Sequence, residues 1–112
     1  MSIETVSEEC PEPRAGHSAI LFEDKMYVYG GKNEENNKLN DFWSFDLTTF
    51  EWQRLADADN VGLSRSGHSV CVYENHMIVF GGIHEITKEL DDMFAYSFRD
   101  QKWVSLYKLH EE

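Results

Sequence analysis

The sequence is poor in cysteine, and this excludes a scaffold held together by disulfide bonds. Only two cysteines occur among its 112 residues, Cys10 near the start and Cys71 within an apolar run. Small disulfide-rich domains carry more cysteines at regular spacings. We therefore expect Cys71 to be a small buried side chain in a reducing compartment, which predicts a cytoplasmic location.

Long apolar segments and a secretory signal are also missing. No apolar stretch approaches the roughly 20 residues that a membrane-spanning helix needs. The first residues, MSIETVSEE, have neither the basic start nor the apolar core of a signal peptide. Residues 1–13 are predicted to form an acidic leader, and no membrane partner is expected.

Basic residues are scarce as well. Lysine and arginine number 10 against 21 aspartates and glutamates, which gives a formal net charge of -11. Such a charge disfavours binding to the phosphates of a nucleic acid or to an anionic membrane surface. The predicted partners are therefore proteins with basic or neutral surfaces. The apolar fraction of 41% suits a packed core.

What the chain does contain is a repeat with a fixed offset of 51 residues. Each copy begins with R-x-G-H-S and continues with an apolar run, a glycine pair, an L-x-D segment and a tryptophan. The matched positions are Arg14/Arg65, Gly16/Gly67, His17/His68, Ser18/Ser69, Gly30/Gly81, Gly31/Gly82, Leu39/Leu90, Asp41/Asp92, Trp52/Trp103 and Leu55/Leu106. An offset shared over the whole copy indicates two equivalent structural units.

Each copy is predicted to contain four short strands and no helix, because aromatic and β-branched segments alternate with turn signals. The first two strands of each copy are apolar without alternation, so we expect both of their faces to be buried. The fourth strand alternates, as expected of a strand at the rim. The predicted strands of the first copy cover 18–22, 26–29, 41–45 and 51–55. The first two predicted strands of the second copy cover 70–73 and 77–80.

The order and period of these features resemble the kelch repeat family, over residues 14–55 and 65–106. The resemblance implies an all-β fold of two four-stranded antiparallel blades of a β-propeller. The implied boundaries are a leader at 1–13, blades at 14–57 and 65–107, a connecting loop at 58–64 and a tail at 108–112.

Two blades cannot close a ring, because propellers contain about 4 to 8. Three explanations remain open. Further blades follow in a longer chain, which Met1 and the acidic leader favour; several chains assemble, for example three into a six-bladed ring; or the two sheets collapse into a sandwich.

Four features that recur in both copies have a structural explanation that we prefer to a catalytic one. The glycine pairs lack the Lys-Ser/Thr of a phosphate-binding loop and suit a strand end. The histidines lack a nucleophile or carboxylate partner, so we expect a hydrogen-bonding role. The aspartates should bond to backbone at a strand entry, and the tryptophans should pack in the core. These residues are Gly30, Gly31, Gly81, Gly82, His17, His68, Asp41, Asp92, Trp52 and Trp103.

The candidate partner-binding residues are two arginines and the loops that differ between the copies. The resemblance implies that Arg14 and Arg65 lie near a central channel and contact acidic ligand groups, and the alternative is that they tie the blades together by bonding carbonyls or a carboxylate. The differing loops, at 32–40, 57–64 and 83–91, are where binding specificity usually resides. Their candidates are Asn33, Glu34, Glu35, Asp57, Asp59, His84 and Glu85.

A cation site in the last of these loops, from His84, Glu85, Glu89 and Asp91, is less favoured than a solvated loop. No catalytic, cofactor or metal site is therefore predicted. The predicted function is a non-enzymatic protein-interaction module, an adaptor or scaffold. Two alternatives remain: a segment of a propeller enzyme whose active site needs other blades, and an architectural subunit of a large assembly.

Overall fold

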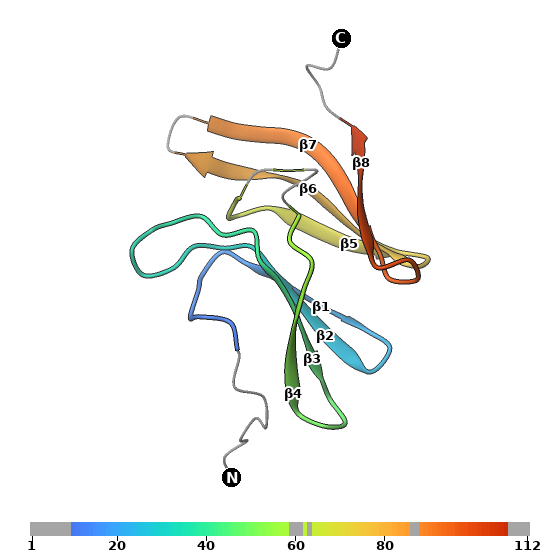
Figure 1. Ribbon diagram of the computed structural model, residues 1–112. Helices are drawn as coiled ribbons and strands as arrows, with labels where there is room; N and C mark the ends of the chain where they lie inside the picture. The colour runs from blue at the N-terminus through green and yellow to red at the C-terminus, as the bar shows by residue number, and fades with distance from the viewer. Residues whose placement is uncertain (1–9, 59–61, 63, 86–87, 108–112) are drawn as a thin grey trace.

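A computed structural model describes residues 10–58, 62, 64–85 and 88–107, and these form two four-stranded antiparallel sheets. Figure 1 shows the two sheets packed against each other, with no helix in either. The strands are β1 Ser18–Phe22, β2 Lys25–Tyr29, β3 Phe42–Asp46, β4 Glu51–Leu55, β5 Ser69–Tyr73, β6 His76–Glu85, β7 Lys88–Ser97 and β8 Lys102–Tyr107. The predicted all-β architecture is confirmed.

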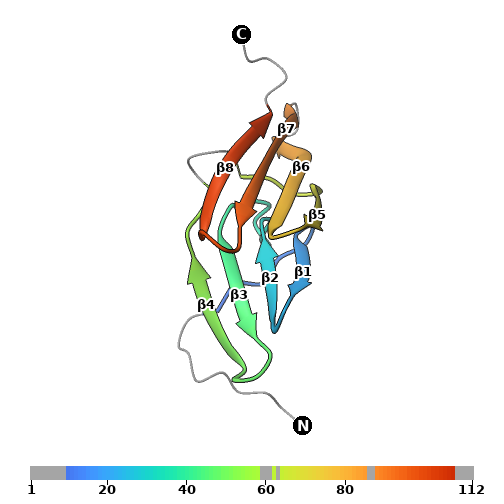
Figure 2. The ribbon, with the colours of Figure 1, turned by 90° about the vertical axis from the view of Figure 1, so that its right-hand side faces the viewer.

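Every strand pairs with its neighbour in the sequence, so the order is β1-β2-β3-β4 in the first blade and β5-β6-β7-β8 in the second. Figure 2 shows that the blades place their strands in the same order, with β1 and β5 at one edge and β4 and β8 at the other. Strands β1 and β5 lie side by side. This is the arrangement of adjacent propeller blades, with the first strand innermost.

The two blades differ most in the hairpin between their second and third strands. In the second blade Gly82 pairs with Leu90 and Ile83 with Glu89, after register shifts, so β6 and β7 run through the segment 83–91. The prediction that this segment is a loop was wrong for most of its residues. In the first blade the corresponding segment is a loop, closed by a bridge between Lys32 and Lys38.

The core lies between the blades and is mainly aromatic. Tyr29 and Phe42 of the first blade meet Phe94, Tyr96 and Trp103 of the second, and all five side chains are buried. The rings of Phe42 and Tyr96 are 4.6 Å apart in an edge-on arrangement, and those of Tyr29 and Trp103 are 5.3 Å apart. Aromatic pairs in this geometry add to the stabilisation from burial alone.

Strands β1 and β5 both depart from the prediction that the apolar strands are buried on both faces, and in β1 Leu21 is 64% exposed. Cys71, Val72 and Tyr73 are exposed, Tyr73 to 64%. The expectation of a buried Cys71 was therefore wrong, because in the described part of the chain no third sheet covers the far side of the second blade. An apolar sequence predicts burial only when a neighbouring sheet is there to provide it.

Candidate functional site

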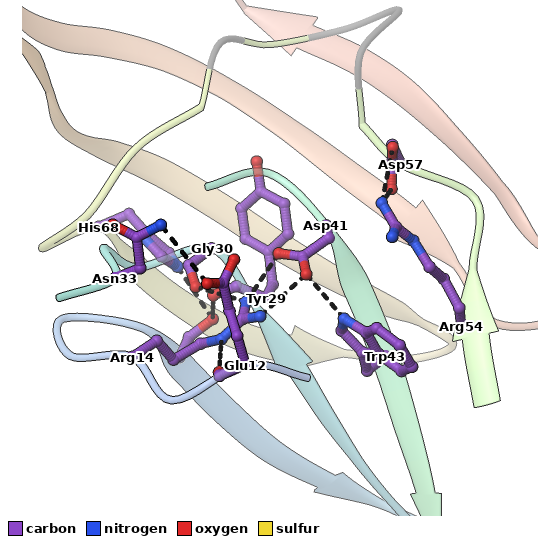
Figure 3. A network of polar contacts seen from close by, with 11 residues as sticks. Glu12, Arg14, Tyr29, Gly30, Asn33, Asp41, Trp43, Arg54, Asp57 and His68 are labelled. Carbon is purple, nitrogen blue, oxygen red and sulfur yellow. Dashed lines mark hydrogen bonds and ion pairs between the residues drawn. The ribbon is translucent and has the colours of Figure 1, made fainter. Parts of the chain in front are cut away.

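Arg14 forms a clamp that holds the end of the first blade together. It donates from Nη1 and Nη2 to the two carboxylate oxygens of Asp41, at 2.7 and 2.9 Å, and from Nη1 to the carbonyl of Gly30 at 3.0 Å. Trp43 donates its indole N–H to the same carboxylate at 2.8 Å, as Figure 3 shows. A bidentate pair of this kind fixes geometry as well as charge.

Asp41 is held ionised by this environment. Burial raises its pKa, but the hydrogen bonds from Arg14 and Trp43, together with the arginine charge, outweigh burial and leave the pKa below the ordinary value. The prediction that the repeated aspartates bond to backbone thus missed their main partners, because the side chain of Asp41 binds an arginine.

The same clamp recurs in the second blade at the offset of the repeat. Arg65 donates to both oxygens of Asp92, at 2.7 and 2.9 Å, and to the carbonyl of Gly81 at 2.9 Å. Its side chain is fully buried, and its guanidinium lies 4.6 Å from the ring centroid of Phe94, which stands where the first blade has Trp43. Both guanidinium groups are therefore engaged within their own blade.

A histidine and a serine join the two blades. His68 Nε2 lies 2.9 Å from Ser18 Oγ, and Ser18 in turn donates to the carbonyl of Tyr29 at 3.3 Å. Because the serine proton is used in this way, His68 donates from Nε2, and its buried Nδ1 has no partner among the described atoms. Burial, followed by the charge of Arg65, lowers the pKa of His68 to about 4. The predicted hydrogen-bonding role is confirmed for His68, whereas its equivalent His17 is exposed.

The first glycine pair follows strand β2 and has positive φ and close neighbours, as predicted. Gly30 has φ 72°, and a Cβ there would lie 2.7 Å from His68 Cε1. Gly31 has φ 102°, and a Cβ there would lie 2.8 Å from the carbonyl oxygen of Ala15. Positive φ and close approach both require glycine at these two positions.

Short backbone bridges connect the loops of both blades at one end of the molecule, which we call the loop edge. It consists of residues 12–17, 31–40, 56–58, 64–67 and 83–85. Backbone bridges link Ala15 with Lys32, Leu39 with Arg65, and Ser66 with Ile83. In Figure 1 the loop after β2, the end of β6 and the start of β7 lie on the same side of the sheets.

The described candidate loop residues all lie at this edge, in two groups. In the first blade Asn33 Oδ1 accepts hydrogen bonds from the backbone N–H groups of Glu35 and Asn37, so the loop is ordered while Glu34 and Glu35 are exposed. With Glu12 and Pro13 they line a shallow hollow of about 220 Å³.

The second group comes from the other blade and from the connection between blades. His84 donates from Nδ1 to the carbonyl of Ser64 at 2.8 Å, and Glu85 is 66% exposed. Asp57 accepts from Arg54 at 3.1 Å. Asp59 lies outside the described residues. The described residues contain no group of three His, Cys, Asp or Glu side chains placed to hold a metal ion.

The alternative that the arginines bond carbonyls or a carboxylate matches these contacts, but the sequence analysis did not identify Asp41 and Asp92 as the carboxylates. The signal was present, since 27 residues separate Arg14 from Asp41 and also Arg65 from Asp92. A spacing that repeats between opposite charges in equivalent units is a usable indicator of an ion pair, although the contact itself depends on the fold.

The geometry defines a protein built from propeller blades, each fastened by an arginine–aspartate clamp beside a glycine pair. A family model described as the KLHDC2/KLHL20/DRC7 Kelch-repeats domain matches residues 1–110. The chain belongs to the kelch repeat family. Over its described residues, no helix is long and apolar enough to cross a membrane.

Several curated proteins resemble the chain over most of its length. Kelch domain-containing protein 2 of Bos taurus is 30% identical over 103 residues, which is 91% of this chain and 25% of that protein. Kelch domain-containing protein 3 of Bos taurus is 34% identical over 76 residues, 68% of this chain and 20% of that protein. Host cell factor 2 of Homo sapiens is 36% identical over 87 residues, which is 72% of this chain and 11% of that protein. The chain spans a quarter or less of each of these relatives.

Proposed function

We propose that the chain is a non-enzymatic protein-interaction module, an adaptor or scaffold, that binds its partner at the loop edge. One observation carries the proposal: the framework at this edge is the same in both blades, whereas the loops on it differ. The clamps of Arg14 and Arg65 and the backbone bridges repeat, but one blade carries an Asn-rich loop and the other a long hairpin. Variable loops on a fixed framework are typical of binding surfaces.

The chemistry of the partner follows from the charges on these loops. Glu34, Glu35 and Glu85 are exposed there, and the chain as a whole carries a formal net charge of -11. The complementary partner is a basic or neutral protein surface, because an acidic edge repels acidic partners and speeds the approach of basic ones. We assign contact roles to Asn33, Asp57 and His84 as well, and a supporting role to the two arginines.

The proposed location is the cytoplasm. Cys10 and Cys71 are both exposed and unpaired in the structure. Exposed free thiols persist in a reducing compartment and tend to oxidise outside one.

The proposal is tested by reversing the charge of the loop. A partner captured by the 112-residue chain is purified, and its affinity is measured by calorimetry for wild type, for Glu34→Lys/Glu35→Lys, and for Glu23→Lys/Glu74→Lys. The control pair is also exposed but lies in the β1–β2 and β5–β6 turns at the opposite end of the sheets. We expect the loop variant to weaken binding at least about tenfold, or about 1.4 kcal/mol, and the control to leave it unchanged. Equal affinities for all three proteins would contradict binding at this edge.

A further inference from the structure

The contact between the two blades, which we call the joint, is formed by a different surface from each blade. The first blade offers Ser18, Tyr29 and Phe42 on the side that faces the second. The second blade contributes His68 and the rings of Phe94, Tyr96, Phe98 and Trp103. The two sides of the joint are different surfaces, so the contact runs head to tail.

The far side of the second blade repeats the side that the first blade offers. We call this surface the tail face. At the offset of the repeat, Ser69 stands for Ser18, Phe80 for Tyr29 and Met93 for Phe42. Tyr29 and Phe42 are fully buried, whereas Phe80 is 46% exposed and Ser69 is exposed.

The far side of the first blade repeats the side that the second blade offers, and we call it the head face. His17 stands for His68, Phe45 for Tyr96, Leu47 for Phe98 and Trp52 for Trp103. His17 is exposed and Leu47 is 44% exposed, while Phe98, its equivalent, stacks on Phe22 with ring centroids 4.0 Å apart. One chain thus carries both halves of a second joint.

We propose that a second copy of this chain docks head to tail, with the head face of one copy on the tail face of the next. His17 of one copy then donates to Ser69 of the other, as His68 donates to Ser18 within the chain. Such a heterologous contact continues until it closes. Rings of two, three or four copies give four, six or eight blades, the range found in propellers. Apart from His17, the residues of both faces lie on the sheets or their far turns and outside the loop edge, and none of them is a proposed partner contact, so the proposal does not rest on partner binding.

The existing joint also predicts which exposed side chains stay outside the contact. Val104 is 42% exposed on the same side of the second blade as Phe80. Its equivalent in the first blade, Gln53, remains exposed although a neighbouring blade is present. Phe80→Asp and Val104→Asp therefore make the same chemical change at similarly exposed positions, one inside the proposed contact and one outside it.

The test is the mass of the purified chain in solution, measured by light scattering after size exclusion over a wide range of concentrations. We expect a defined multiple of the 13.1 kDa chain mass for wild type and for Val104→Asp, and a single-chain mass for Phe80→Asp. A single-chain mass for wild type throughout, or undefined aggregates, would overturn the proposal. Equal effects of both substitutions would overturn it too, since the contact would not follow the template of the internal joint.

Mixing two variants tests the direction of the contact. Phe80→Asp damages only the tail face and Leu47→Asp only the head face, so each alone should be a monomer. A mixture retains one intact head face and one intact tail face, and we expect a one-to-one complex of two chains. A mixture that stays monomeric, with both variants folded by circular dichroism, rejects head-to-tail docking.

Cysteine labelling gives a readout that does not depend on any substitution at the faces. Cys71 corresponds to Ile20, which packs against the core of the joint, while Cys10 lies outside both faces. Assembly should slow alkylation of Cys71 relative to Cys10, and dilution to monomer should restore it. Equal rates at all concentrations would count against the docking.

Discussion

The imidazole of His68 lies 2.9 Å from the hydroxyl of Ser18, so the second blade is hydrogen-bonded to the first across 50 positions of sequence. The ring is wedged between Gly30, Tyr29 and the backbone of the first blade. Its neutral form is the one that fits, because burial and the nearby charge of Arg65 both oppose protonation.

Acid should therefore loosen the joint through His68. Its pKa is about 4 in the folded chain and about 6.5 when unfolded. Between these pH values the imidazole is protonated in the unfolded chain but not in the folded chain. The contribution of His68 to the free energy of unfolding is therefore fully present above pH 6.5 and falls as the pH drops towards 4. Between pH 6.5 and pH 4, the free energy of unfolding of wild type should fall by about 3 kcal/mol more than that of His68→Gln. Urea unfolding at both pH values measures this difference. An NMR titration that places the His68 pKa near 6.5 would contradict the prediction.

The buried clamp of the second blade should be costly to break. Arg65→Met leaves the Asp92 carboxylate without its bidentate partner in a site where the arginine is fully buried, and we expect a loss of about 3–5 kcal/mol in the free energy of unfolding. Arg54→Met removes the more exposed pair with Asp57 and should cost about 1 kcal/mol or less. Similar losses for the two variants would show that burial of the clamp contributes little.

Gly30 and Gly67 have nearly the same φ but different surroundings, so alanine substitutions at the two positions distinguish the cost of backbone strain from the cost of steric crowding. Gly30 has φ 72° and Gly67 φ 69°, but a Cβ at Gly30 would meet His68 Cε1 at 2.7 Å, whereas a Cβ at Gly67 would meet no atom within 4 Å. Gly30→Ala should therefore destabilise the fold by about 1–3 kcal/mol more than Gly67→Ala. Chemical denaturation of both variants measures the difference in the free energy of unfolding, and equal losses would mean that backbone strain alone explains the need for glycine at Gly30.

The two repeated tryptophans should differ in importance. Trp103 is 5% exposed, packs on rings of both blades and donates its indole N–H to the carbonyl of Ala56 at 2.8 Å. Trp52 packs only within the first blade, against Trp43 and Phe45, among the described ring contacts. Thermal unfolding should show that Trp103→Ala lowers the free energy of unfolding by about 3–5 kcal/mol and that Trp52→Ala lowers it clearly less. A larger loss at Trp52 would contradict the assignment of the core.

The strands were predictable from the sequence because their signals are local. The first and fourth strands of the first blade match the predicted ranges, since the turns at Glu23 and Thr48–Thr49 interrupt apolar runs within a few residues. Because the second copy repeats the first at a fixed offset, the same four strands could be predicted for the second blade.

The features that were not predicted depend on distant partners. Whether Ile83 lies in a loop or a strand depends on its pairing with Glu89, and the apolar pattern is the same in either case. The exposure of Cys71 depends on the sheet next to it. The clamp between Arg14 and Asp41 needs three strands to be in place before the two groups meet.

Because each strand pairs only with its sequence neighbour, the sheets can form by closing short turns, which is the rapid part of folding. The contacts between the blades, such as Trp103 with Ala56, join residues 47 positions apart and must come later or more slowly. Hydrogen exchange should accordingly resolve two hairpin stacks that open separately and one joint between them. The two blades are then held to each other mainly by the rings around Tyr29 and Phe42, so loss of that packing should separate the sheets before either sheet loses its own hairpins.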